Sequence, residues 1–372
     1  KNAFADNEQS LNSKIAYSQK LFKGFIHTNS VYETSSGNIP NQEYIYIKTE
    51  PGQGFYTWID YNNNGIKEFN EFEIAKFKDE AEYLRVALPN LNFINTQRAK
   101  WTQSVVLNPS QWANASGFKK IASKFYNQTH FLIDNEQKRV NDGFNINPFD
   151  IDEDKLLGLN FSLRNSLFYN KNLQRYSFTY TYGTSKNKQL YSIGDQENNT
   201  LLHQLEMHHK LGKFWLIDLA TSRSENSVET ENFANKNYQI NTSGILTKFT
   251  FLYNKDHRFS LFYQFKDKKN IQQDFEKLQQ HKFGTSYFFI GKKNMQINAE
   301  INLFLNDFEG NQNSPVSYQM LEGLQSGKNY TWSLGYLKKM NSFLNLSFNY
   351  LGRKSEDSNI IHTGSIQLRA HF

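Results

Sequence analysis

The chain has 372 residues, and its 42 Lys and Arg against 36 Asp and Glu give a formal charge of +6. The basic residues are scattered through turns and polar segments, so we expect no nucleic-acid partner. The absence of cysteine excludes disulfides and thiolate metal sites. No apolar run approaches the roughly 20 residues of a membrane helix, whereas 32 Phe, 21 Tyr and many Asn favour strands and turns.

The first residues, Lys1 to Ser10, lack the basic and apolar regions of a secretory signal, so we expect a mature or truncated chain. Segments 12–22 and 24–36 alternate apolar and polar residues and are joined by a tight turn at Lys23-Gly24. We therefore predict that residues 1–36 hold N-terminal strands of a barrel.

Residues 37–93 are predicted to form an insertion between strands, and this insertion contains one chemical motif. Asp60 begins a twelve-residue stretch that fits the calcium-loop pattern D-x-[DN]-x-[DN]-G-x₅-E. Side-chain, main-chain and carboxylate oxygens at defined positions of such a loop bind Ca²⁺, and a Gly at position six permits the sharp turn. The predicted metal ligands are Asp60, Asn62, Asn64, Ile66, Glu68 and Glu71.

The flanks of this loop are unusual for a calcium sensor. The segment 54–59 before it resembles a strand, and we expect a short helix over 71–82 after it. A loop without a helix pair lacks the opening motion of a sensor, so we predict a structural ion. The alternative is an Asn-rich turn without metal.

Residues 94–372 are predicted to form the remainder of the barrel. Segments 94–108 and 118–134 are plausible strands, and from about residue 157 apolar and polar residues alternate with period two, as half-buried strands require. One face of the clearest example carries Met295, Ile297, Ala299, Ile301, Leu303 and Leu305. The eleven strands of this part are predicted near 157–169, 173–185, 199–211, 213–224, 237–253, 257–269, 278–290, 295–306, 328–339, 342–354 and 361–372.

The connections between these strands alternate between short and long. Residues 338–342 are short and 353–360 longer; 291–294 are short and 308–327 long. Short periplasmic turns and longer extracellular loops are typical of bacterial outer-membrane barrels. If Phe372 lies at the periplasmic end, the short turns are periplasmic and residues 37–93 are extracellular. The alternative fold is a soluble β-sandwich or jelly roll, which also alternates but does not explain this parity.

The fold class is therefore predicted to be all-β, a transmembrane antiparallel β-barrel of about 14–16 strands with long extracellular loops. Fifteen strands are counted, yet bacterial single-chain barrels normally have an even number. Either one assignment is wrong or, as we prefer, a strand precedes Lys1; sixteen strands is the first expectation and fourteen the second.

The last strand alternates through Ile366, Leu368 and Ala370 and ends on Phe372. An aromatic last residue resembles the signal by which barrel-assembly machinery recognises its substrates, and an apolar strand edge can be paired by β-augmentation. We expect outer-membrane lipid and, during biogenesis, the barrel-assembly machinery as partners.

Three segments resemble large, mostly uncharacterised outer-membrane proteins of Bacteroidota. They are 54–75, with the calcium motif, then 321–332, and finally Gly352-Arg-Lys-Ser355 with Ile361-His-Thr-Gly364. The resemblance implies an outer-membrane location and no agreed activity. Because large barrels of this group often work in multi-protein assemblies, including protein-insertion and secretion machineries, it also implies outer-membrane or surface proteins, lipoproteins among them, as partners.

The sequence bears on three classes of function. An enzyme is not expected: His203 and His209 share one strand face and His208 the other, and no nucleophile, base and orienting group can be assigned. A diffusion channel for small solutes is the alternative, since predicted inward residues such as Arg164 and Glu300 are polar. Further inward residues are Glu206, Lys210 and Arg369. The preferred function is a structural or accessory subunit that presents its ordered, aromatic-rich insertion to partner proteins.

Overall fold

The computed structural model describes residues 10–40, 43–88, 93–140, 143–171, 175–191, 193–272, 274–291, 295–341, 343–356 and 358–370. The predictions for residues 1–9 and for Phe372 lie outside the described residues. In the part that is described, no helix is long and apolar enough to cross a membrane.

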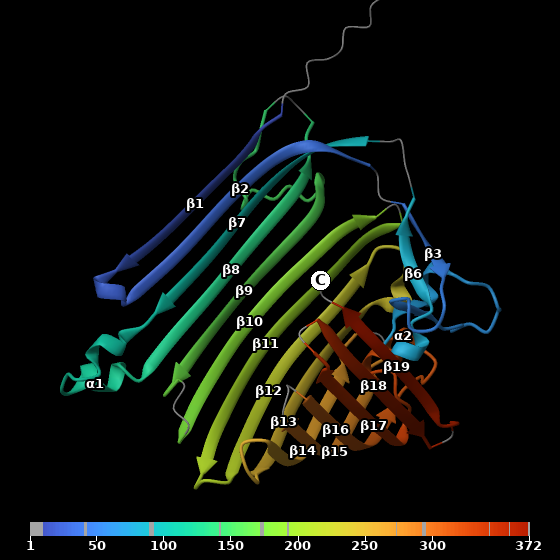
Figure 1. The fold of residues 1–372 in the computed structure, drawn as a ribbon. Coiled ribbons are helices and arrows are strands. Elements are labelled where there is room, and N and C mark those ends of the chain that lie inside the picture. The colour runs from blue at the N-terminus through green and yellow to red at the C-terminus, as the bar shows by residue number, and fades with distance from the viewer. Residues whose placement is uncertain are drawn as a thin grey trace, which may run out of the picture.

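One curled antiparallel sheet of fifteen strands forms most of the molecule, and its strands follow one another along the chain apart from one insertion (Figure 1). The all-β antiparallel barrel architecture predicted from the sequence is confirmed, and each of the fifteen predicted strands has its counterpart. The strands are β1 Asn12–Leu21, β2 Ile26–Pro40, β7 Phe93–Leu107, β8 Phe125–Lys138, β9 Leu156–Tyr169, β10 Tyr176–Tyr191, β11 Gly194–Leu211, β12 Trp215–Thr230, β13 Tyr238–Leu252, β14 His257–Asn270, β15 Lys277–Gly291, β16 Met295–Glu309, β17 Gly327–Lys339, β18 Leu344–Ser355 and β19 Ile361–Ala370.

The two edges of this sheet are β1 and β19, which are not paired with each other in the described residues. Neighbouring strands alternate in direction and fifteen is odd, so β1 and β19 run the same way. The number of strands in the described sheet agrees with the fifteen strands predicted from the sequence.

Two local predictions are wrong. Residues 118–122 form helix α1 (Phe118–Ala122), because Phe118, Ile121 and Ala122 recur at helical spacing and line one apolar hollow. Residues 71–82 form no regular helix; the chain there pairs as β5 (Phe72–Ile74) with β4 (Tyr56–Trp58) and continues into the short turn η3 (Lys78–Glu80).

The connections lie at two ends of the sheet, called here the turn end and the loop end. Residues 22–25, 212–214 and 253–256 are short connections at the turn end, and the insertion and residues 310–326 lie at the loop end. The predicted parity fails twice. Residues 108–124, with η4 (Pro109–Trp112) and α1, form a long connection at the turn end, and β10 and β11 extend until only residues 192–193 join them at the loop end.

The two faces of the sheet differ in chemistry. On the outer face one row across neighbouring strands contains Leu167, Tyr180, Leu205, Thr221, Ile245 and Phe265. The adjacent row on the inner face contains Ser166, Thr181, Gln204, Ser222, Gly244 and Lys266. The apolar row is the more exposed: Ile245 is 54% exposed and Leu205 46%, whereas Thr181 is 5% exposed. This pattern is the reverse of a water-soluble protein.

The insertion between β2 and β7 forms its own sheet of four short antiparallel strands, in the order β3-β6-β4-β5. With its turns η2 and η3 we call residues 43–88 the cap. In Figure 1 the cap lies beside helix α2 at the loop end. The remaining elements are β3 Tyr44–Lys48, β6 Tyr83–Ala87, α2 Pro315–Leu321, η1 Phe22–Gly24, η2 Phe69–Glu71 and η5 Ala234–Lys236.

Candidate functional site

The cap is built around aromatic rings. Alternation along β3 puts Tyr44 and Tyr46 on one face and Ile45 and Ile47 on the other. The Tyr46 ring stacks on Phe72, with centroids 4.0 Å apart, and Phe72 in turn meets Tyr83 edge-on. The cap therefore has a small aromatic core of its own.

Helix α2 packs the connection of residues 310–326 against the inner face of the sheet at its loop end. Ser314 and Ser317 cap its first turn reciprocally, and Pro315 stands at its start, where no N–H is needed. The buried side chains Val316, Met320 and Leu321 then pack against inner-face residues of three strands. These wall residues are Ile240, Leu278 and Phe308.

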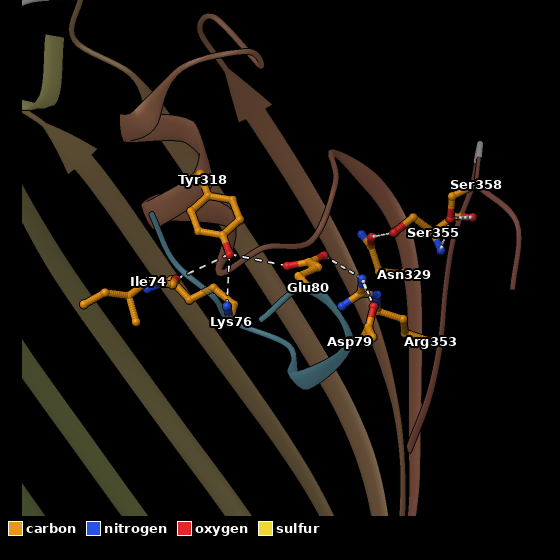
Figure 2. A network of polar contacts seen from close by, with 9 residues as sticks. All are labelled: Ile74, Lys76, Asp79, Glu80, Tyr318, Asn329, Arg353, Ser355 and Ser358. Carbon is orange, nitrogen blue, oxygen red and sulfur yellow. Dashed lines mark hydrogen bonds and ion pairs between the residues drawn. The ribbon is translucent and has the colours of Figure 1, made fainter. Parts of the chain in front are cut away.

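A polar network joins the cap to α2 and β18, as Figure 2 shows. The Arg353 guanidinium of β18 donates to Asp79 at 2.7 Å and to Glu80 at 2.5 Å. The same guanidinium lies 3.9 Å from the Phe77 ring centroid. The Tyr318 hydroxyl of α2 accepts the Lys76 N–H at 2.9 Å and donates to Glu80 at 3.4 Å. Burial raises the pKa of Glu80, and Arg353 opposes this shift.

Two further ion pairs hold this end together. Lys236, between β12 and β13, contacts the buried Glu73 of the cap at 3.1 Å and donates to the Phe72 carbonyl. Burial raises the pKa of Glu73, against the attraction of Lys236. Glu322, after α2, accepts from Lys266 and Lys268 at 2.7 Å each. Burial alone would raise the pKa of Glu322, but these two ammonium groups outweigh it and hold that pKa at about 2.

The predicted calcium loop is a tight turn that closes on its own side chains. Asp60 accepts the N–H groups of Asn64 and Gly65 at 3.1 and 2.8 Å. Asn64 accepts the Ile66 N–H at 2.6 Å. Gly65 has a φ of +71°, which glycine adopts without strain. The side-chain oxygens therefore lie on the concave side of the turn, toward its backbone N–H groups.

The end of the loop supplies one buried oxygen without a partner. Glu71 is 1% exposed; its Oε2 accepts the Trp58 indole N–H at 2.8 Å, while its Oε1 has no hydrogen-bond partner. An unpartnered buried carboxylate oxygen is costly unless a cation satisfies it. Glu68 instead accepts from the Asn62 amide at 2.8 Å. The donor types therefore fit calcium, with Glu68 turned toward Asn62.

No three His, Cys, Asp or Glu side chains of the described chain gather as a metal-binding group. The three carboxylates of the predicted set, Asp60, Glu68 and Glu71, are therefore not gathered as such a group, and its other three oxygens come from Asn62, Asn64 and the Ile66 carbonyl. Calcium binding by this loop stays a prediction.

The face predicted for each singled-out wall residue agrees with the strand register. Glu206 and Lys210 share the inner register with Gln204, and Glu300 pairs with the inner-face Ser333. His203 lies on the outer face and bonds Tyr180 at 2.8 Å, whereas His208 lies on the inner face, 2.6 Å from Asp218. In the part of the chain that is described, no hydroxyl is bonded to this His–Asp pair. Arg164 and Arg369 also share the inner register.

Sequence reasoning missed the residues that fix the cap. Arg353, Tyr318 and Lys236 each contact the cap from more than 160 residues away. No motif marks them, so only the folded chain brings them together.

No family model matches the chain, and no curated protein does. Among solved structures it is similar to the translocator domain of the autotransporter NalP from Neisseria meningitidis, at 11% identity and a TM-score of 0.26, over 58% of this chain and 80% of that one. It is also similar to the outer-membrane expressed OmpT of Vibrio cholerae, at 6% identity and a TM-score of 0.35, over 90% and 89% of the two chains. A third structure, titled "Asymmetric conductivity of engineered proteins", shares 7% identity at a TM-score of 0.27, over 91% and 100%. Similarities this distant carry no conclusion about activity.

Proposed function

We propose that the chain is the wall of a bacterial outer-membrane β-barrel and serves as a structural or accessory subunit of a multi-protein assembly there. The membrane location is supported by the reversed surface: apolar side chains such as Ile245, Leu261 and Ile301 are 54%, 65% and 59% exposed on the outer face. Lipid solvates such a face, while polar inner residues such as Gln280 and Asn306 stay covered.

Aromatic and histidine side chains on the outer face support the same location. Tyr263 and His281 bond at 2.9 Å, and Tyr350 and His362 at 2.8 Å. Amphipathic rings of this kind are enriched where a barrel meets the membrane–water interfaces. With the loop end outside the cell and the C-terminus periplasmic, as proposed, the cap faces the surroundings of the cell.

The observation that carries the accessory role is an exposed apolar face on a fixed cap. Ile45 pairs with Val86 across β3 and β6, and each is 38% exposed; Ile47 is 44% exposed. The opposite face of the same sheet packs toward the wall. A rigid apolar patch that its own chain leaves uncovered is typical of a protein–protein contact. We propose an outer-membrane or surface protein, such as a lipoprotein, as its partner.

We include in this proposal a structural calcium ion held by the loop of residues 60–71. Its six predicted ligands supply oxygen atoms only, which calcium prefers. The ion would stiffen the turn beside Trp58, whose indole is bonded to Glu71.

A diffusion channel is the second candidate, since the inner face is polar. Helix α2, the residue after it and the cap contact that face at the loop ends of β13–β18. These contacts count against a wide channel mouth at the loop end of these strands. Conductance in planar bilayers distinguishes the two functions.

The test of the accessory role is co-purification from native membranes in mild detergent. The protein is expected to bring a partner with it, and the double variant Ile45→Asp, Ile47→Asp is expected to lose that partner while its wall stays folded. Ile271→Asp is the matched control, because Ile271 is 45% exposed at the loop end but outside the cap. A wild-type protein that purifies alone, or a partner retained by the double variant, contradicts the proposal.

A further inference from the structure

A cleft of about 380 Å³ lies between the inner side of the cap and the extended ends of β10 and β11. Tyr44, Tyr56 and Arg85 line it from the cap, and Asn187 and Tyr191 from the wall. Tyr44 and Tyr191 meet edge-on with centroids 5.5 Å apart, so cap and wall touch at its rim. The volume is within the range of small-ligand sites.

Arg85 is the unusual residue of this cleft. Its guanidinium carbon lies 4.9 Å from the Tyr44 ring, 5.8 Å from Tyr56 and 5.2 Å from Tyr191. It forms no ion pair with a carboxylate in the described part of the chain. Its guanidinium also interacts with the Tyr191 and Tyr44 hydroxyls, but a guanidinium has five N–H donors, and those that remain form a fork that matches a carboxylate.

The charges around Arg85 leave the cleft suited to an anion. Glu73 is paired with Lys236 at 3.1 Å, and Asp195 lies 3.4 Å from Lys188. The carboxylates that line the cleft thus already have cationic partners, and the charge of Arg85 stays uncompensated.

The remaining polar groups of the cleft are mostly amides. Asn187, Gln196 and Asn198 of the wall line it beside the tyrosine rings. An amide can both donate to and accept from a hydroxyl, and an aromatic ring offers an apolar platform for the C–H face of a sugar ring. Rings, amides and one guanidinium without a carboxylate partner together match a ligand that has hydroxyls, an apolar ring face and a carboxylate.

We propose that this cleft binds an acidic saccharide, with the sugar carboxylate on Arg85, its ring against Tyr44 or Tyr191, and its hydroxyls on the wall amides. The site requires no partner protein, so it stands or falls independently of the accessory role.

The test is calorimetric titration of the purified full chain in detergent with digalacturonate, with the neutral disaccharide galactobiose and with acetate. Digalacturonate is expected to bind tightest. Arg85→Gln is expected to weaken it about tenfold, the order of one lost charge-assisted contact, without changing the weak binding of galactobiose. Arg258→Gln is the matched control, because Arg258 stands over Phe288 at the turn end.

A second variant guards against misfolding of the cap. Tyr191→Leu removes a ring that the wall contributes to the cleft and leaves the residues of the cap itself unchanged, and it is expected to weaken both disaccharides. Equal binding of digalacturonate to wild type and Arg85→Gln overturns the proposal. Acetate binding as tight as digalacturonate overturns the saccharide part, because the carboxylate alone would then be recognised.

Discussion

The wall and the cap are both antiparallel sheets, yet they are stabilised differently. In the wall each strand from β7 to β19 pairs with its neighbour in sequence over ten or more residues. In the cap, β4 pairs with β5 over three residues and with β6 through Tyr56 and Tyr83 alone. A sheet this small is marginal by itself. The cap therefore depends on contacts with distant parts of the chain, whereas the wall depends on its ladder and its surroundings.

The largest expected effect tests what surrounds the wall. Ile245 and Leu246 are adjacent aliphatic residues in the middle of β13 and lie on opposite faces. If the outer face meets lipid, Ile245→Arg is expected to lower the free energy of unfolding by about 2–4 kcal/mol, and Leu246→Arg by much less. Urea titration of protein folded into lipid vesicles measures both. Equal effects of the two substitutions would mean that lipid does not cover the outer face.

A smaller effect is expected where the cap meets the wall. Arg353 is 13% exposed and its loss leaves Asp79 and Glu80 without their cation, so Arg353→Met is expected to weaken cap docking by about 2–3 kcal/mol. Hydrogen exchange of residues 72–82 should then rise while that of β9–β16 is unchanged.

The control for this variant is Arg98→Met on the uncapped part of the wall. Arg98 pairs with Asp134 at 2.5 Å but its side chain is 48% exposed, so a cost of about 0–1 kcal/mol is expected. If Arg353→Met leaves exchange in residues 72–82 unaltered, the network of Figure 2 does not hold the cap.

The same contrast explains what could be predicted from the sequence. Period-two alternation marks a strand that has one face in lipid, so the segment from Met295 to Glu309 was recognised with nearly its full length. Alternation fades where both faces are polar. For this reason the extension of β10 to Tyr191 and the start of β11 at Gly194 were missed.

Only the part of the site whose residues are close together in the sequence could be predicted. The motif from Asp60 to Glu71 requires a fixed spacing within twelve residues, and the turn it implies is formed, with Gly65 at positive φ. The partners of the cap follow no such spacing. Glu80 meets Arg353 at a separation of 273 residues, and no pattern in one sequence indicates such a pair.

The smallest expected effect concerns the loop of residues 60–71 within the cap. An ion that binds only the folded loop stabilises it by RT ln(1 + [Ca²⁺]/Kd), about 1.4 kcal/mol at a free concentration ten times Kd. Millimolar calcium is therefore expected to slow proteolysis of the cap, and a chelator to reverse this. Glu71→Gln should abolish the response, because Glu71 holds the unpartnered oxygen. Glu50→Gln, an exposed cap residue outside the loop, should keep it. If calcium protects neither the wild type nor Glu50→Gln, the turn is held by its own hydrogen bonds, and the cap is ordered by its contacts with the rest of the chain without an ion.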